Sequence, residues 1–108
     1  MAKDFLSEHF QVDNYNNDFV DFDDVVGSYR AKVTEDDIVI LWADYMYEDY
    51  QGESEVYFFD KRDGLFYEVH AYHCSCYGLE DQWEPEEIGD LYFTLEYFNR
   101  QDLTKVLK

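Results

Sequence analysis

The chain has 108 residues and a formal net charge of −18, from 26 Asp and Glu against 8 Lys and Arg. Disordered acidic chains are poor in aromatic residues, whereas this chain has 20% aromatics and a single proline, which indicates one folded domain over residues 1–108. Charge repulsion disfavours direct binding to nucleic acid or to an anionic membrane, so a basic protein is the expected partner.

The N-terminal part of the chain is acidic and rich in asparagine. Residues 4–10 predict a short helix with Phe5, Leu6 and Phe10 on one side. Residues 11–24 hold three Asn and five Asp, residue types that favour turns, and a single-turn helix is the alternative. We therefore expect an N-terminal acidic segment with little regular structure.

The central part of the chain predicts an antiparallel meander. Residues 25–33 favour a strand with a bulge or bend at Gly27. A turn containing Gly52 follows the second strand, and residues 61–64 form a hairpin turn in which Gly64 accepts a positive φ. The three further strands are expected over residues 37–47, 55–60 and 65–72.

The C-terminal part leaves two interpretations open. Pro85 suits the first turn of a helix, whose apolar face would hold Ile88, Leu91, Leu95 and Phe98. Gly89 and the β-favouring residues after Leu91 instead favour a fifth strand over 91–98. Residues 102–107 predict a last short helix. The predicted fold class is α+β, a four- or five-stranded antiparallel sheet (meander) with an N-terminal acidic segment and one or two C-terminal helices.

Four potential zinc ligands lie close together at the end of the last strand of the meander and directly after it: His70, His73, Cys74 and Cys76. Imidazole and thiolate are preferred zinc ligands, but only one residue separates the cysteines and no distant second pair exists, unlike a standard structural site. The alternative is a tight, partly buried loop with reduced cysteines packed as small apolar residues. We predict no cofactor and no resident metal.

Catalytic motifs are absent from the sequence. A cysteine beside His73 is the one plausible nucleophile, and the surrounding acidity would keep its thiol protonated. No glycine-rich phosphate loop and no EF-hand pattern is present. No apolar stretch reaches the roughly 18 residues that cross a bilayer, and the first residues do not resemble a signal peptide. We therefore expect a non-enzymatic, cytoplasmic protein.

The acidic residues occupy three stretches without Lys or Arg: residues 4–29, 33–60 and 63–99 hold seven, nine and nine acids. Carboxylates on adjacent strands can approximate the density of phosphates along a nucleic acid. A basic groove could therefore accept the protein in place of DNA or RNA. The predicted partner-binding acids are Asp36, Asp37, Asp44, Glu48, Asp49, Glu53 and Glu55, then Asp21, Asp23 and Asp24, with Tyr45, Tyr47 and Tyr50 as aromatic contacts.

The segment HCSCYGLEDQWEPEE at residues 73–87 resembles a stretch of small uncharacterised proteins from tailed bacteriophages. In size, acidity and aromatic content the chain is also similar, as a class, to acidic phage inhibitors of restriction and CRISPR proteins. The resemblance implies a phage-encoded nucleic-acid mimic, of anti-restriction or anti-CRISPR type, that acts in the host cytoplasm on a basic host protein. A zinc-stabilised or apolar-face adaptor for assembly is the alternative. A homodimer that buries apolar surface would offset the self-repulsion.

Overall fold

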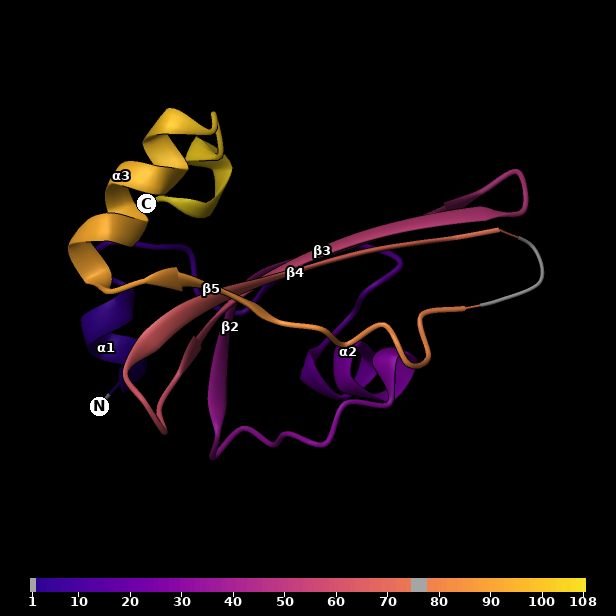
Figure 1. Ribbon diagram of the computed structural model, residues 1–108, viewed down its shortest axis with the longest axis horizontal. Helices are drawn as coiled ribbons and strands as arrows, with labels where there is room; N and C mark the ends of the chain where they lie inside the picture. Colours follow the sequence, from indigo (N-terminus) through magenta and orange to yellow (C-terminus); the bar gives the residue numbers. More distant parts are fainter. Residues whose placement is uncertain (1, 75–77) are drawn as a thin grey trace.

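The computed structural model of the chain describes residues 2–74 and 78–108. In this part of the chain, five strands form one sheet that carries helices on both faces (Figure 1). The elements are α1 (Ala2–Leu6), β1 (Asn14–Asn17), α2 (Phe22–Tyr29), β2 (Ile38–Glu48), β3 (Gln51–Asp60), β4 (Leu65–His73), β5 (Glu86–Gly89), α3 (Leu91–Arg100) and the 3₁₀ turn η1 (Thr104–Val106). The strands lie in chain order across the sheet, β1 parallel to β2 and each later pair antiparallel. The predicted α+β fold, with five strands and a C-terminal helix, is confirmed, although the sheet is mixed and not purely antiparallel.

Strand β1 lies where the sequence predicted turns. Its four residues, three of them asparagines, pair with the outer edge of β2. Tyr15 packs against the core, and the Asn16 side-chain amide donates a hydrogen bond to the Ala43 carbonyl at 3.3 Å. The strand ends at Asn17, whose φ of 58° lies in the left-handed region that asparagine tolerates. Pairing with a long neighbouring strand thus outweighs the local turn preference.

Helix α2 occupies a segment that the sequence assigned largely to a strand. The strand predicted over residues 25–33, with a bend at Gly27, is wrong, because α2 includes Gly27 and ends at Tyr29. The Asp21 carboxylate accepts a hydrogen bond from the Asp24 backbone N–H at 2.8 Å and caps the helix. Capping and an apolar face that reaches the sheet therefore outweigh the β propensity of the valines. The buried residues of this helix are Phe22, Val25 and Tyr29.

The central meander follows the prediction. The strands expected over 37–47, 55–60 and 65–72 correspond to β2, β3 and β4. The β3–β4 connection is the predicted turn at 61–64, in which Gly64 has a φ of 74°. Gly52 was expected in the preceding turn but lies inside β3, because Asp49 and Tyr50 alone form the two-residue β2–β3 loop, both with positive φ.

The C-terminal segment is a helix over most of the predicted range, so the competing strand over 91–98 is wrong. The Asp90 carboxylate accepts a hydrogen bond from the first turn of α3 and caps it. The helix does not reach back to Pro85, because the intervening residues pair with β4 as β5. The short helix predicted over 102–107 is found as η1.

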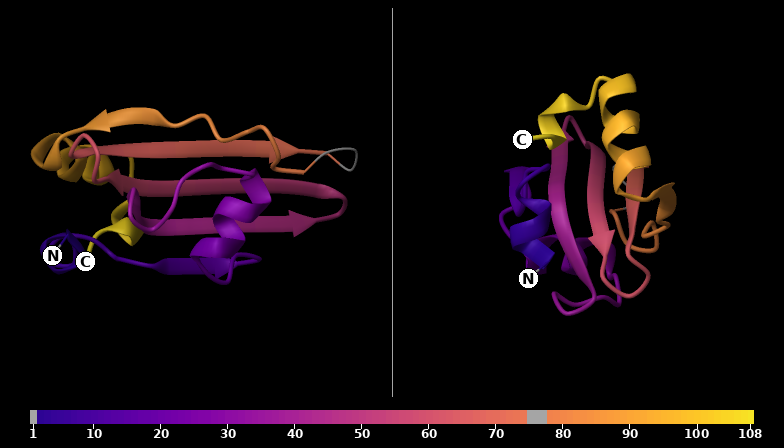
Figure 2. Two further views of the ribbon diagram at one scale, coloured as in Figure 1. Left: turned by 90° about the horizontal axis from the view of Figure 1, so that it is seen from below. Right: turned by 90° about the vertical axis from the view of Figure 1, so that its left-hand side faces the viewer.

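Two hydrophobic cores lie on opposite faces of the sheet. Figure 2 shows α2 crossing the strands on one of these faces. The first core joins α2 to the sheet and contains Phe19, Phe22, Val25, Tyr29, Ile38, Ile40, Ala43, Val56, Phe58, Val69, Ala71 and Leu79. The second core joins α1, α3 and η1 to the other face and contains Leu6, Phe10, Val39, Leu41, Tyr57, Phe66, Ile88, Phe98 and Val106. The α1 helix was predicted over 4–10; it ends at Leu6, and both Leu6 and Phe10 are buried.

The second core covers only the end of its sheet face that lies near the β3–β4 turn. Toward the β2–β3 loop, the strands extend beyond α1, α3 and η1, and no described helix lies over them on this side (Figure 1). Half of one sheet face is therefore available to solvent, while the opposite face of the same strands packs on α2.

Candidate interaction surface

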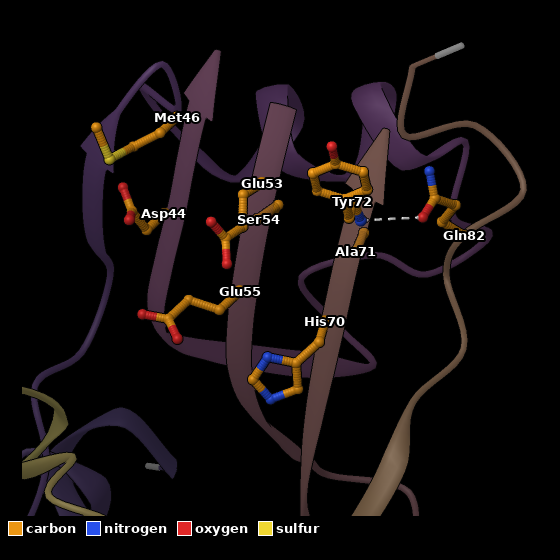
Figure 3. Close-up of a pocket in the computed structure, with 9 residues that line it drawn as sticks. All are labelled: Asp44, Met46, Glu53, Ser54, Glu55, His70, Ala71, Tyr72 and Gln82. Carbon is orange, nitrogen blue, oxygen red and sulfur yellow. Dashed lines mark hydrogen bonds between the residues drawn. The ribbon is translucent and has the colours of Figure 1, made fainter. Parts of the chain in front are cut away.

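The uncovered half of the sheet presents two rows of side chains across three strands. Side chains alternate between the faces of a strand, and the strand register places alternate residues of β2, β3 and β4 beside one another. We call this surface the acidic sheet face (Figure 3). Its first row is Asp44, Glu55 and His70, and its second row is Met46, Glu53 and Tyr72.

The acidic sheet face is concave. It forms a depression of about 540 Å³ whose lining includes all six residues of the two rows, together with Gln82 at the edge beside β4. The Gln82 side-chain carbonyl accepts a hydrogen bond from the Tyr72 backbone N–H at 3.2 Å (Figure 3). Met46 is 49% exposed and Tyr72 is 60% exposed, so the depression combines carboxylates with accessible thioether and aromatic surface.

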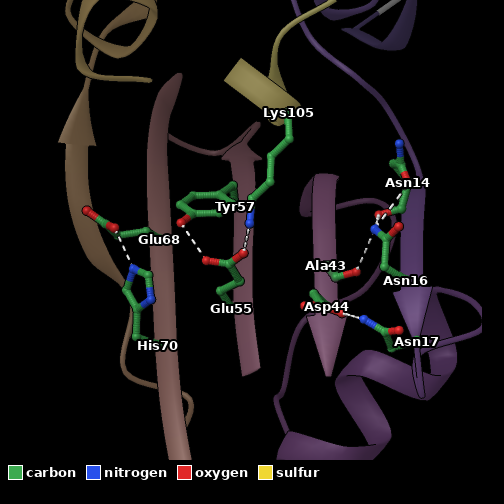
Figure 4. A network of polar contacts seen from close by, with 10 residues as sticks. All are labelled: Asn14, Asn16, Asn17, Ala43, Asp44, Glu55, Tyr57, Glu68, His70 and Lys105. Carbon is green, nitrogen blue, oxygen red and sulfur yellow. Dashed lines mark hydrogen bonds and ion pairs between the residues drawn. The ribbon is translucent and has the colours of Figure 1, made fainter. Parts of the chain in front are cut away.

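A lysine from the C-terminal turn neutralises one of these carboxylates. Lys105 forms an ion pair with Glu55, whose other carboxylate oxygen accepts a hydrogen bond from the Tyr57 hydroxyl at 3.0 Å (Figure 4). The Lys105 ammonium also lies 5.3 Å from the centre of the Trp42 ring, within the range of a cation–π contact. Burial and the nearby Glu55 carboxylate raise the pKa of Tyr57 well above its usual range, so its hydroxyl remains a donor.

A second polar group lies at the β4 edge of the surface. The His70 imidazole is 2.7 Å from one oxygen of Glu68, and the Tyr97 hydroxyl donates to the other oxygen at 2.7 Å. The hydrogen bond to Glu68 raises the pKa of His70 despite partial burial. Burial alone would raise the pKa of Glu68, but the hydrogen bonds from His70 and Tyr97 outweigh it and lower that pKa. His70 therefore adds positive charge to the first row as the pH falls.

The remaining carboxylates have few cationic partners. Asp44 accepts a hydrogen bond from the neutral amide of Asn17 (Figure 4), and Glu53 forms no ion pair within the described residues. Among residues 2–74 and 78–108, no group of three or more His, Cys, Asp and Glu side chains is arranged to hold a metal ion. The carboxylates are thus spread across the strands, an arrangement that suits several separate cationic groups better than one ion.

The structure brings four of the predicted partner-binding acids onto one surface. Asp44, Glu53 and Glu55 lie in the two rows, and Glu48 follows Met46 on the same side of β2, opposite Gln51. Asp49 and Tyr50 lie at the tip of the β2–β3 loop. These residues form a continuous region at the uncovered end of the sheet.

The other predicted contact residues lie elsewhere. Asp36 and Asp37 precede β2 at the opposite end of the strand, where Asp37 accepts a hydrogen bond from the Thr34 backbone N–H at 3.0 Å. Asp21, Asp23 and Asp24 lie at the start of α2, beside the opposite sheet face. Tyr45 and Tyr47 also belong to that opposite face, where both rings contact His73.

Three residues of the surface were not predicted as partner contacts: Met46, Tyr72 and His70, the last of which was considered only as a zinc ligand. Period-two alternation fixes which face of its strand each of these residues occupies. Only the strand register shows that they lie beside the predicted acids, and the sequence alone does not give that register. Lys105 was missed because it is 50 residues from Glu55 in the chain.

The two histidines of the candidate zinc cluster lie on opposite faces of the sheet and cannot share a site. His70 is on the acidic sheet face, beside Glu55. His73 is buried on the other face, with Nε2 2.7 Å from the Tyr45 hydroxyl and Nδ1 2.9 Å from the Cys74 carbonyl, so both ring nitrogens are engaged. Cys74 is exposed, and Cys76 lies outside the described residues.

Comparison with protein-family models, with curated proteins and with solved structures found no match. Within the described residues, none of the helices combines the length and apolar character needed to span a membrane.

Proposed function

We propose that the protein is a non-enzymatic inhibitor that binds a basic, nucleic-acid-binding protein and blocks its groove by nucleic-acid mimicry. The observation that carries this proposal is the uncovered half of the sheet, where rows of carboxylates face solvent and Lys105 is the one described lysine or arginine paired with them. The resemblance of residues 73–87 to tailed-phage proteins favours a host defence protein, such as a CRISPR effector or a restriction enzyme, as the first partner to test.

Rigidity distinguishes this surface from a flexible acidic tail. The carboxylates project from central strands whose opposite face is packed on α2, so their positions are set before binding. A preorganised surface loses less conformational entropy on association than a disordered polyanion of the same charge. Strand geometry spaces alternate side chains by roughly 6.6 Å along a strand and neighbouring ones by about 5 Å across strands. Several phosphate-binding residues of a groove could therefore be engaged together.

The proposed mechanism is competitive occlusion. A net charge of −18 attracts a basic partner from a distance and accelerates association, an effect that salt screens over about 8–10 Å. Binding should therefore weaken as the salt concentration rises, and the bound partner should lose its own nucleic acid.

Capture and competition measurements test this proposal together. The immobilised protein is exposed to a bacterial lysate at low and at high salt, and each captured protein is purified and mixed with a labelled DNA or RNA oligonucleotide. The expected result is salt-sensitive capture of nucleic-acid-binding proteins, followed by release of the oligonucleotide on addition of the acidic protein. Captured partners that bind the protein and the oligonucleotide simultaneously would contradict mimicry.

One observation favours a second candidate, the apolar-face adaptor. Tyr92 and Phe93, adjacent on α3, are 80% and 55% exposed and form an accessible apolar site away from the acidic sheet face. Association through this site, with another protein or with a second copy of the chain, would resist salt. Sedimentation at high salt compares the association of the native protein with that of a Tyr92→Ser/Phe93→Ser variant. Association through the apolar site would persist in the native protein and be lost in the variant.

A further inference from the structure

The second row of the acidic sheet face combines three chemical groups with which lysine and arginine side chains interact differently. Glu53 lies between Met46 on β2 and Tyr72 on β4, so a carboxylate is flanked by a thioether and by an aromatic ring. Both flanking side chains are about half exposed. A cation that approaches Glu53 therefore also contacts apolar and aromatic surface.

We propose that this face selects arginine over lysine, and that it takes an arginine side chain of its partner against the Met46–Glu53–Tyr72 row. The inference deepens the proposed function, on which it rests for the existence of a basic partner, by naming the residue type that is recognised. The guanidinium is weakly hydrated and planar, and it stacks on aromatic rings, whereas an ammonium is a compact and strongly hydrated charge. A row with an exposed tyrosine beside a carboxylate thus favours the guanidinium.

The arrangement of the three carboxylates supports the same preference. Figure 3 shows Asp44, Glu53 and Glu55 projecting over β2 and β3, with Tyr72 on the β4 side of Glu53. These carboxylates are not arranged to hold one metal ion. A guanidinium has five N–H donors in a fixed plane and can bond to two separate carboxylates at once, while an ammonium acts as a point charge.

The chain itself already holds one cationic side chain by a carboxylate and an aromatic ring on this surface. Lys105 pairs with Glu55, and its ammonium lies 5.3 Å from the centre of the Trp42 ring. This contact occupies the end of the first row that adjoins the second core. The second row offers the same pair of groups, Glu53 and Tyr72, and no described lysine or arginine pairs with Glu53.

Two basic peptides of equal length and charge test the inference, one composed of Arg and Gly and the other of Lys and Gly. Their dissociation constants are measured by fluorescence anisotropy at one salt concentration. A cation–π contact at an exposed site corresponds to roughly a two- to fivefold difference in affinity. We expect the native protein to bind the arginine peptide more tightly by about this factor.

Two tyrosine variants locate the preference. In Tyr72→Ala the advantage of the arginine peptide should shrink, because the arginine peptide loses more affinity with the ring than the lysine peptide does. Tyr92→Ala, which removes a still more accessible tyrosine from α3, should keep the full preference. Melting curves confirm that both variants are folded.

The outcomes separate this inference from the proposed function. Equal affinities of the native protein for both peptides, or an undiminished preference in Tyr72→Ala, would overturn arginine selection even if the protein displaced nucleic acid from a partner. A Tyr72-dependent preference would support it even if the captured partners kept their nucleic acid. Absence of binding to either peptide would overturn arginine selection, whereas the proposed function is decided by the capture and competition measurements.

Discussion

Neutralising three carboxylates of the acidic sheet face should weaken binding far more than neutralising three acids elsewhere. The test variant is Asp44→Asn/Glu53→Gln/Glu55→Gln. The control variant, Asp23→Asn/Asp36→Asn/Glu87→Gln, changes the net charge by the same amount. The three control side chains make no hydrogen bond or ion pair within the described residues, so their loss leaves the fold intact.

The magnitude follows from the state of each carboxylate. Asp44 and Glu53 are available to a partner, because neither forms an ion pair with a described lysine or arginine, whereas Glu55 is already paired with Lys105. An exposed ion pair contributes about 0.2–1 kcal/mol. The loss of two such contacts amounts to as much as about 2 kcal/mol, which corresponds to up to about 30-fold weaker binding.

The assay is anisotropy of the labelled arginine peptide, repeated with a captured partner, over a range of salt concentrations. The test variant should show the weaker binding and a shallower dependence of affinity on salt, and the control variant should remain within about threefold of the native protein. Equal weakening by both triple variants would refute the reasoning, because binding would then follow the total charge and not this surface.

Three further predictions concern the fold. In Gly52→Ala the added Cβ would lie 2.6 Å from Cε1 of the buried His73 ring and closer still to Nε2, so we expect a loss of about 1–3 kcal/mol in thermal unfolding; an unchanged melting temperature would contradict the close approach. Tyr29→Phe removes the hydroxyl that donates a 2.7 Å hydrogen bond to the buried Ser54 hydroxyl, which should lower the free energy of urea unfolding by about 1–2 kcal/mol at an unchanged m-value. The Arg62 side chain lowers the pKa of Asp60, so this pair stabilises the fold above pH about 4 and its contribution is lost as the pH falls through the lowered pKa; Asp60→Asn should melt earlier than the native protein at pH 7 and together with it in strong acid.

Local signals predicted the sheet well where strand and turn preferences agree. β2, β3 and β4 are rich in β-branched and aromatic residues, and Gly64 supplies the positive φ of the connecting turn. These local signals failed where strand pairing or helix capping outweighs the preference of the residues themselves. The asparagines of β1 pair with the edge of β2, and the valines of α2 lie in a helix that Asp21 caps.

The candidate site could be predicted only in part, because its location depends on the strand register and on the packing of the helices. Alternation along β2 and β3 places Asp44, Glu53 and Glu55 on one face once the register is known. Which half of that face stays open depends on where α1, α3 and η1 pack, and this follows from the second core. The same register places Tyr72 beside Glu53. These two residues are separated in the chain by most of the β3–β4 hairpin, so their contact cannot be inferred from local sequence.

The exposed rows and the cores occupy alternate positions of the same strands, and this division has an evolutionary consequence. In the uncovered half of the sheet, Ser54 and Ala71 face α2, whereas their chain neighbours Glu53, Glu55, His70 and Tyr72 belong to neither core. Partner recognition can therefore diversify by substitution at every second residue without disturbing the packing. In diverging copies of this chain, we expect the inward positions of β3 and β4 to change slowly and the outward ones to follow the partner.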